Sequence, residues 1–204
     1  MKKFMIVCFA FFCIALNAQV KTIAPGEIAP AIKLLNVDSK VVTFDDYSAA
    51  KGFIIIFTCN TCPYSKAYEQ RVIALNNKYA SLGFPVIAIN PNNPGVSPGD
   101  SFEKMKERAA SKKYTFPYLY DDGQIVTTAY GAKNTPHVFL INKTPQGNII
   151  AYTGAIDNDT PDTNPAKTKY AEDAIAALLD NKTPATAVTK AIGCRIAWGK
   201  NKQN

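Results

Sequence analysis

The sequence predicts an α/β fold in which helices cover both faces of a central mixed β-sheet. Three observations support this: short apolar runs alternate with segments of helical periodicity, residues 53–57 are apolar throughout, and two late strand-like runs are spaced as a hairpin. A strand that is apolar at every position is typically buried on both faces. Alternating strands and helices place such a strand inside a sheet with helices on either side. We expect residues 19–204 to form one domain, with a C-terminal extension from about residue 181.

Each predicted strand is a short apolar run bounded by turn-forming residues. The first two runs flank the turn-like residues 36–39, and the last two flank residues 145–148, which favour a hairpin. The predicted strands are residues 32–35, 41–44, 53–57, 84–90, 118–120, 138–141 and 149–152.

The longer predicted helices have apolar or aromatic residues at three- and four-residue spacing, which places those side chains on one face. In the longest helix this spacing runs from Tyr68 to Tyr79, and Gly83 is a natural stop. Asp100 or Ser101 is suited to cap the second helix. The predicted helices are residues 64–82, 102–113, 124–130 and 170–179.

The N-terminus has the pattern of a secretory signal peptide. Lys2 and Lys3 precede an apolar core, residues 4–16, and Ala18 offers a small residue at a cleavage point. This core is too short to span a bilayer, and a buried N-terminal helix is the alternative. We expect residues 1–18 to be removed and the mature chain to be exported to the periplasm or another extracytoplasmic compartment, without stable membrane insertion.

The charge balance is moderately basic, with 23 Lys and Arg against 16 Asp and Glu and a formal net charge of +7. The basic residues are scattered along the chain rather than clustered. A nucleic-acid-binding surface requires such a cluster. We therefore expect no nucleic-acid partner.

Two cysteines separated by two residues, Cys59 and Cys62, lie between a predicted strand and a predicted helix. A helix N-terminus presents free N–H groups and the positive end of the helix dipole, and both stabilise a thiolate. Cysteines in such Cys-x-x-Cys pairs can have a pKa lowered from about 8.5 to roughly 3.5–7.5. Disulfide exchange needs an attacking thiolate and a second thiol that resolves the mixed disulfide. We therefore predict a redox-active disulfide in which Cys59 is the catalytic nucleophile and Cys62 the catalytic resolving thiol.

Loss of the signal peptide would leave three cysteines, Cys59, Cys62 and Cys194. A secreted disulfide scaffold normally carries a larger, even set, so this count favours a working pair over an inert structural disulfide. A zinc site would want a second Cys/His pair, whereas the chain has one histidine, His137. We expect neither a metal nor another cofactor. Cys194 could resolve a mixed disulfide, pair with another chain or pack as a small apolar residue, and His137 could tune the thiols or point away from them.

Three stretches of the sequence resemble the thioredoxin-fold redoxin family, in particular an AhpC/TSA-like, peroxiredoxin-like subgroup with a Cys-x-x-Cys motif. Residues 57–64 resemble the active-site turn, and residues 129–141 resemble the segment in which a cis-proline faces the cysteines. Residues 116–121 and 193–198 resemble extracytoplasmic and bacterial members of the subgroup. The resemblance implies a thioredoxin-like fold over most of the mature chain.

This resemblance also implies a cis peptide bond between Thr135 and Pro136, which would place backbone beside the dithiol and bind an incoming substrate as a short strand. It implies a thiol–disulfide oxidoreductase whose partners are protein thiols or disulfides and an upstream redox partner. Two departures leave the direction of the reaction open. The tryptophan expected before the first cysteine is Thr58, and the buried acid expected on the preceding strand is Phe53.

Two other functions use the same fold. A peroxiredoxin-like, thiol-dependent peroxide reductase needs Pro-x-x-x-Thr-x-x-Cys, and with Cys62 as the peroxidatic thiol those Thr and Pro positions hold Cys59 and Ile55. A Cu(I) carrier would use Cys59, Cys62 and His137, because soft thiolates suit Cu(I), although such carriers usually separate their cysteines by three residues. We therefore rank thiol–disulfide exchange first.

Overall fold

The computed structural model describes residues 21–200 of the chain. The strands are β1 Lys33–Asn36, β2 Val41–Thr43, β3 Gly52–Phe57, β4 Val86–Asn90, β5 Tyr118–Tyr120, β6 Asn134–Thr135, β7 His137–Thr144, β8 Gly147–Gly154 and β9 Cys194–Arg195. The α-helices are α1 Pro63–Tyr79, α2 Phe102–Lys112, α3 Ile125–Tyr130 and α4 Tyr170–Leu179. Four short 3-10 helices are η1 Phe44–Asp46, η2 Ala80–Leu82, η3 Pro98–Asp100 and η4 Asp122–Gln124.

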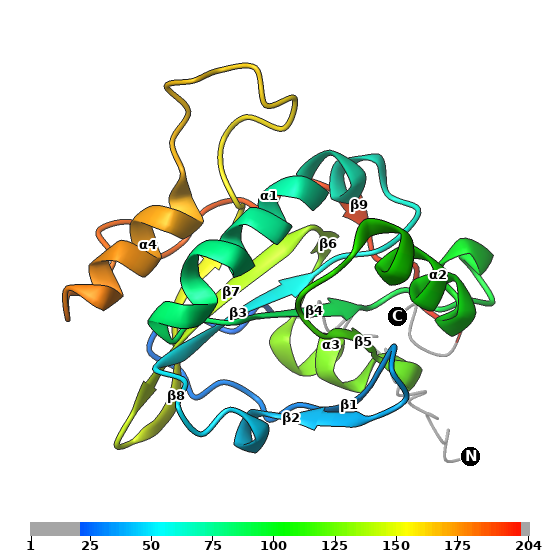
Figure 1. Cartoon of the computed structure of the whole chain (residues 1–204), viewed down its shortest axis with the longest axis horizontal. Helices are drawn as coiled ribbons and strands as arrows, with labels where there is room; N and C mark the ends of the chain where they lie inside the picture. The colour runs from blue at the N-terminus through cyan, green and yellow to red at the C-terminus, as the bar shows by residue number, and fades with distance from the viewer. Residues whose placement is uncertain (1–20, 201–204) are drawn as a thin grey trace, which may run out of the picture.

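A seven-stranded mixed sheet forms the centre of the molecule, in the order β2-β1-β5-β4-β3-β7-β8 (Figure 1). β3, β4 and β5 run parallel, and the remaining pairs of this sheet are antiparallel. A separate two-stranded sheet pairs β6 with β9. The central position of β3, between β4 and β7, explains why its sequence is apolar on both faces.

Helices lie on both faces of the sheet, as the sequence predicts. Side chains of a strand alternate between its faces, so β3 contributes to two cores. Ile54 and Ile56 pack with buried residues of α1, α2 and α4, whereas Phe53, Ile55 and Phe57 pack with α3 and the N-terminal lead-in. All five side chains are fully buried. β3 is therefore fixed from both sides, which gives the turn that follows it a rigid support.

Helix α1 begins immediately after the second cysteine of the dithiol. Cys62 is its N-cap in an extended conformation, and Pro63 occupies the first helical turn, where its missing N–H costs no hydrogen bond. The helix continues through η2 to Gly83, whose φ of +96° is a conformation that suits glycine. The order strand, turn, helix fixes both cysteines at one end of β3.

The predicted elements are all present, with shifted ends. The predicted hairpin is confirmed, and β7 and β8 extend toward a tighter turn between Thr144 and Gly147. Residues 80–82 of the first predicted helix form a 3-10 turn instead of α-helix. β6 and β9, each two residues long, are not among the predicted strands. β9 lies in the region expected to be a C-terminal extension.

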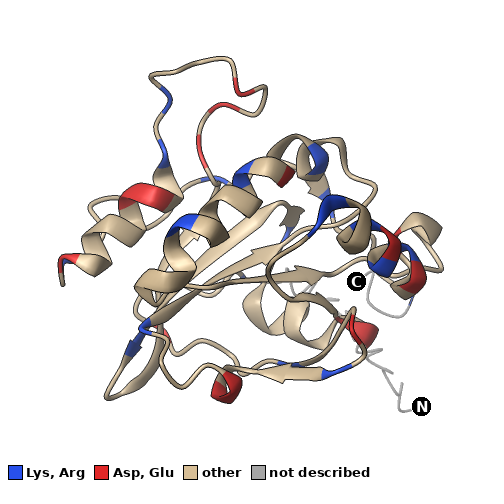
Figure 2. Cartoon of the chain, in the orientation of Figure 1, with Lys and Arg blue, Asp and Glu red and all other residues tan. Residues whose placement is uncertain are grey.

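The predicted signal peptide, residues 1–18, lies outside the described residues, and one domain over residues 19–204 stays a prediction. Across residues 21–200, no helix combines the length and the apolar character that a membrane span requires. Positively and negatively charged residues are interspersed along α2 (Figure 2), where Lys104 pairs with Glu107 and Lys106 with Glu103.

Candidate active site

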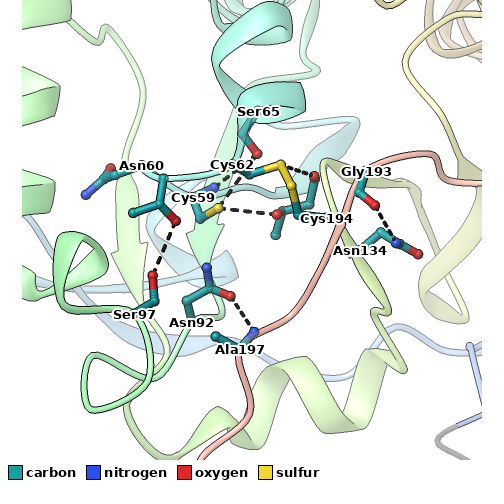
Figure 3. The surroundings of a disulfide bond; sticks show 12 residues. Cys59, Asn60, Cys62, Ser65, Asn92, Ser97, Asn134, Gly193, Cys194 and Ala197 are labelled. Carbon is teal, nitrogen blue, oxygen red and sulfur yellow. Dashed lines mark hydrogen bonds between the residues drawn. A yellow bond between two sulfur atoms is a disulfide. The ribbon is translucent and has the colours of Figure 1, made fainter.

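The two cysteines lie where three segments of the chain meet. β3 leads into the turn that carries Cys59 and Cys62, and its parallel neighbour β4 leads into a loop that ends near Asp100. The carboxyl ends of parallel strands meet at one edge of a sheet, where sites are commonly built. The third segment is residues 189–199, which we name the C-terminal strap (Figure 3).

Cys59 is a free thiol that is 4% exposed. Its Sγ lies 3.2 Å from Oγ1 of Thr135 and 3.9 Å from Oγ of Ser65. Its backbone N–H donates to the same Ser65 oxygen at 3.4 Å. A hydroxyl group can rotate to donate its hydrogen. Two hydroxyl groups are therefore placed to donate to this sulfur when it is a thiolate.

Cys62 is joined to Cys194 by a disulfide, with a Cα–Cα distance of 5.9 Å (Figure 3). The predicted disulfide between Cys59 and Cys62 is therefore not the pairing in this structure. The cause is the β6–β9 ladder, which sets Cys194 opposite Thr135 and brings it within disulfide range of Cys62. Sγ of Cys62 also lies 3.1 Å from the carbonyl oxygen of Thr135. Both sulfurs of the dithiol thus contact Thr135.

The peptide bond between Thr135 and Pro136 is cis, which confirms the prediction. Thr135 is fully buried, and its backbone pairs with Cys194. The side-chain amide of Asn134 adds to this contact by donating to the carbonyl oxygen of Gly193 at 2.9 Å. The predicted substrate-binding residues therefore lie beside both cysteines, with their strand edge occupied by the C-terminal strap. Their role in binding substrate stays a prediction.

Asp100 is a fully buried carboxyl group in residues 97–101, which we name the Asp100 loop. One of its oxygens accepts the N–H of Asn60 at 2.6 Å, and the other accepts the hydroxyl of Thr61 at 2.7 Å. Asn92 and Ser97 donate to the second oxygen at 2.8 and 2.6 Å. A buried carboxylate is costly unless it is hydrogen-bonded. Here neutral donors provide those bonds, and two of them belong to the dithiol turn.

Asn60, the residue after Cys59, is held from three directions. In addition to its bond to Asp100, its side-chain amide donates to the carbonyl oxygen of Gly99 at 2.9 Å, and its Oδ1 accepts the hydroxyl of Tyr118 at 3.0 Å. Burial, and to a smaller extent the nearby Cys59, raises the pKa of Tyr118 well above its ordinary value. Tyr118 therefore remains a protonated donor, and the conformation of the turn is set by β5 and the Asp100 loop together.

Residues 25–152 match the profile of the AhpC/TSA family, which is more than half of the chain. These residues include the dithiol turn and the cis-proline, but not Cys194. The chain belongs to the AhpC/TSA family.

Individual proteins similar to this AhpC/TSA chain include both solved structures and named enzymes. The crystal structure of an uncharacterized conserved protein from Geobacillus kaustophilus has 34% identity and a TM-score of 0.79. The match covers 86% of this chain and 93% of the Geobacillus chain. A Mycobacterium tuberculosis protein provisionally named a peroxiredoxin is 26% identical over 137 residues, which are 67% of this chain and 80% of its own. Thiol-disulfide oxidoreductase ResA of Geobacillus thermodenitrificans is 28% identical over 124 residues, 59% of this chain and 65% of its own.

The fold is also that of the thioredoxin domain of a thiol-disulfide oxidoreductase from Bacteroides vulgatus, which matches 63% of this chain and 87% of that domain with 20% identity and a TM-score of 0.52. These similarities confirm three predictions: the resemblance to the redoxins, the thioredoxin-like α/β fold, and an oxidoreductase. The AhpC/TSA chain is a thioredoxin-like oxidoreductase. The family match and the relatives do not assign roles to individual residues, so the catalytic roles of Cys59 and Cys62 remain predictions.

His137 of this AhpC/TSA chain is buried, and its ring nitrogens contact groups other than sulfur. Its Nδ1 accepts the N–H of Lys133 at 3.4 Å, so Nε2 carries the proton and donates to Oγ1 of Thr153 at 3.0 Å. Burial, and then the charge of Lys133, lowers the pKa of His137 to about 4. Among residues 21–200, no three His, Cys, Asp or Glu side chains are grouped to hold a metal ion. The three ligands that a Cu(I) carrier would use are thus not assembled here.

The sequence alone does not predict that Asp100 and Cys194 lie beside the dithiol. Asp100 was expected as a possible helix cap, but Ser101 caps α2 and Asp100 turns toward the dithiol. The signal available for Asp100 was topological, since its loop follows the strand parallel to β3. The sequence shows Cys194 as a third thiol but does not indicate its partner. A separation of 132 residues between the paired cysteines carries no local pattern.

Proposed function

We propose that this protein is an exported thiol–disulfide oxidoreductase that exchanges disulfides with cysteines of other proteins through Cys59 and Cys62. The observation that supports it best is the placement of the two sulfurs. Both lie in the turn that leads into α1, where Cys62 is the N-cap, and both contact Thr135 beside the cis-proline; Cys59 also has two hydroxyl groups within reach. The relatives named as thiol–disulfide oxidoreductases support protein thiols as the substrate class.

In the reducing direction, the thiolate of Cys59 attacks one sulfur of a disulfide in a substrate protein. A mixed disulfide forms, and the other substrate sulfur leaves as a thiolate. The thiolate of Cys62 then attacks Sγ of Cys59, which releases the substrate as a dithiol and leaves a Cys59–Cys62 disulfide. An upstream redox partner reduces that disulfide. In the oxidising direction the same steps run in reverse.

Cysteine variants test the assignment. Turnover of a protein disulfide substrate should be lost in Cys59→Ser, because no other thiol begins the exchange. Cys62→Ser should trap the mixed disulfide, which is visible as a covalent adduct on a non-reducing gel. Turnover of Cys59→Ser equal to that of wild type would reject the proposal.

The direction of the reaction follows from an equilibrium with glutathione. A Cys59–Cys62 potential near about −270 mV would make the protein a reductant, and one near about −120 mV would make it an oxidant. The measurement is best made on Cys194→Ser, in which the third cysteine cannot compete for Cys62. Export is tested separately by N-terminal analysis of the secreted protein, which should begin at Gln19.

A peroxide reductase is the second candidate, because the structure pairs Cys62 with a distant cysteine. In that reaction the thiolate of Cys62 attacks a peroxide oxygen, an alcohol leaves, and a sulfenic acid forms. The thiol of Cys194 then displaces water and forms the Cys62–Cys194 disulfide. Rapid formation of Cys62 sulfenic acid in Cys194→Ser at micromolar peroxide would favour this candidate, and its absence would exclude it.

A further inference from the structure

Cys194 lies outside the residues that match the AhpC/TSA family, yet the structure places it at the dithiol. We propose that Cys194 is a third redox thiol and that Cys59 and Cys194 alternate as the disulfide partner of Cys62. The Cys62–Cys194 disulfide closes the C-terminal strap over the edge of Thr135, and the Cys59–Cys62 disulfide lets the strap open. This proposal rests on the proposed thiol–disulfide chemistry of Cys59 and Cys62.

In the form with the Cys62–Cys194 disulfide, an external disulfide has no access to the nucleophile. Cys59 is 4% and Cys62 3% exposed, and Thr135 is fully buried. The backbone of Thr135 pairs with Cys194 of the same chain, so a substrate strand cannot pair there. Exchange requires the attacking sulfur to reach a sulfur of the substrate. This form is therefore closed, and an active cycle needs a way to open it.

The strap is attached firmly at positions on either side of Cys194. On the N-terminal side, the N–H of Thr189 donates to the carbonyl oxygen of Thr153 at 3.0 Å. On the C-terminal side, Ile196 is buried in the core, and the N–H of Ala197 donates to Oδ1 of Asn92 at 2.9 Å.

Residues 190–195 lie between these attachments. They are held by the two-residue β6–β9 ladder, by the Asn134–Gly193 hydrogen bond and by the disulfide. Loss of the disulfide leaves the two-residue ladder and the Asn134–Gly193 hydrogen bond to keep this part in place. It can therefore lift away from Thr135 while both attachments remain intact.

The three sulfurs are arranged for direct exchange. Sγ of Cys59 and Sγ of Cys62 contact the side chain and the carbonyl group of the same residue, Thr135, at 3.2 and 3.1 Å. The thiolate of Cys59 attacks Sγ of Cys62, the Cys59–Cys62 bond forms, and the Cys62–Cys194 bond breaks. Cys194 leaves as a thiolate, which takes up a proton from solvent because this residue is partly exposed. One disulfide is exchanged for another, so no external oxidant or reductant is consumed.

Disulfide mapping tests the exchange directly. Oxidised wild-type protein is quenched in acid, its free thiols are blocked, and its peptides are analysed without reduction. Both the Cys59–Cys62 and the Cys62–Cys194 linkages are expected. Cys59→Ser should contain only the latter and Cys194→Ser only the former. A single linkage in wild type, whichever it is, would overturn the proposal.

A variant without any change in sulfur tests the coupling to the strap. A Cβ at position 193 would overlap the carbonyl oxygen of Thr135. Gly193→Ala should therefore weaken the ladder and shift the linkage ratio toward Cys59–Cys62 by about fivefold or more, which corresponds to the loss of one good hydrogen bond. The matched control is Ile192→Ala, whose side chain is 50% exposed on the same segment. Equal ratios in the two variants would contradict the coupling.

Proteolysis reports the position of the strap, because Lys190 and Arg195 are exposed trypsin sites within the part that lifts. Oxidised Cys59→Ser, locked closed, should be cleaved there about tenfold more slowly than Cys194→Ser, since cleavage requires local opening. Equal rates would overturn the proposal. Turnover separates this proposal from the proposed function. If Cys59→Ser loses activity, but neither the disulfide linkages nor the cleavage rates differ among wild type and the two variants, the proposed function stands and Cys194 has no redox role.

Discussion

The dithiol turn is held by two segments that are attached in different ways. The Asp100 loop binds the turn through a buried carboxyl group and its hydrogen bonds to Asn60 and Thr61. The C-terminal strap binds through the disulfide to Cys62 and a two-residue ladder. The first attachment does not depend on the redox state of the cysteines, whereas the second does. The Asp100 loop therefore supports the turn in every redox state, which we call the permanent side of the site, whereas the attachment of the strap changes with the redox state of Cys62 and Cys194.

The largest expected effect is on the permanent side. Asp100→Ala leaves the N–H of Asn60 and the amide of Asn92 buried without their acceptor, which should lower the free energy of unfolding by roughly 4 kcal/mol. Chemical denaturation should show the same loss with and without reductant. The control Asp45→Ala, at an exposed position, should change stability by less than about 0.5 kcal/mol. A loss below about 1 kcal/mol in Asp100→Ala would show that the loop is not the main support.

The strap should show the opposite dependence on redox state. Oxidised Cys59→Ser, which keeps the Cys62–Cys194 disulfide, should be about 3 kcal/mol more stable than Cys59→Ser/Cys194→Ser, because the disulfide restricts the unfolded chain. Added reductant should abolish the difference. A difference that persists in reductant would mean that Cys194 stabilises the fold by packing rather than by its bond.

The burial of His137 on β7 should make the protein less stable in acid. The pKa of His137 is lowered to about 4 from 6.5, mainly by burial. Between these two values the unfolded chain binds a proton that the folded chain does not, so stability is full above pH 6.5 and falls as the pH drops toward 4. The loss should be at most about 3 kcal/mol. His137→Gln should flatten this part of the stability profile, and because the chain has one histidine, NMR can follow the imidazole directly. Titration near 6.5 would contradict the burial argument.

The smallest effects come from single hydrogen bonds on each side. Thr61→Val removes a donor to Asp100, and Asn134→Ala removes a donor to Gly193. Each should cost about 1 kcal/mol. The cost of Thr61→Val should be the same in both redox states, while that of Asn134→Ala should appear only in the form with the Cys62–Cys194 disulfide. Equal redox dependence in the two variants would remove the distinction between the segments.

The sequence predicts the parts of this fold that have a repeating pattern. The apolar run of β3 and the spacing from Tyr68 to Tyr79 are long enough to indicate their elements without tertiary context. The dithiol turn and the cis bond before Pro136 were also within reach, the first from its position between strand and helix and the second from the family resemblance.

The remaining parts depend on contacts between distant segments. β6 and β9 contain two residues each, which is too few for any periodicity. Asp100 and Ser101 are both good caps by residue type, and packing against the dithiol turn decides which one caps the helix. The pairing of Cys62 with Cys194 follows from the same short ladder, so it could not be anticipated before the ladder was known.

Asn92 joins the two sides of the site. Its Nδ2 donates to Asp100 at 2.8 Å, and its Oδ1 accepts the N–H of Ala197 at 2.9 Å. An aspartate at this position would keep the acceptor but set a second negative charge against Asp100, and a leucine would satisfy neither neighbour. A group that is donor at one end and acceptor at the other is therefore required there, and it ties the resting position of residue 197 to the loop beside Cys59.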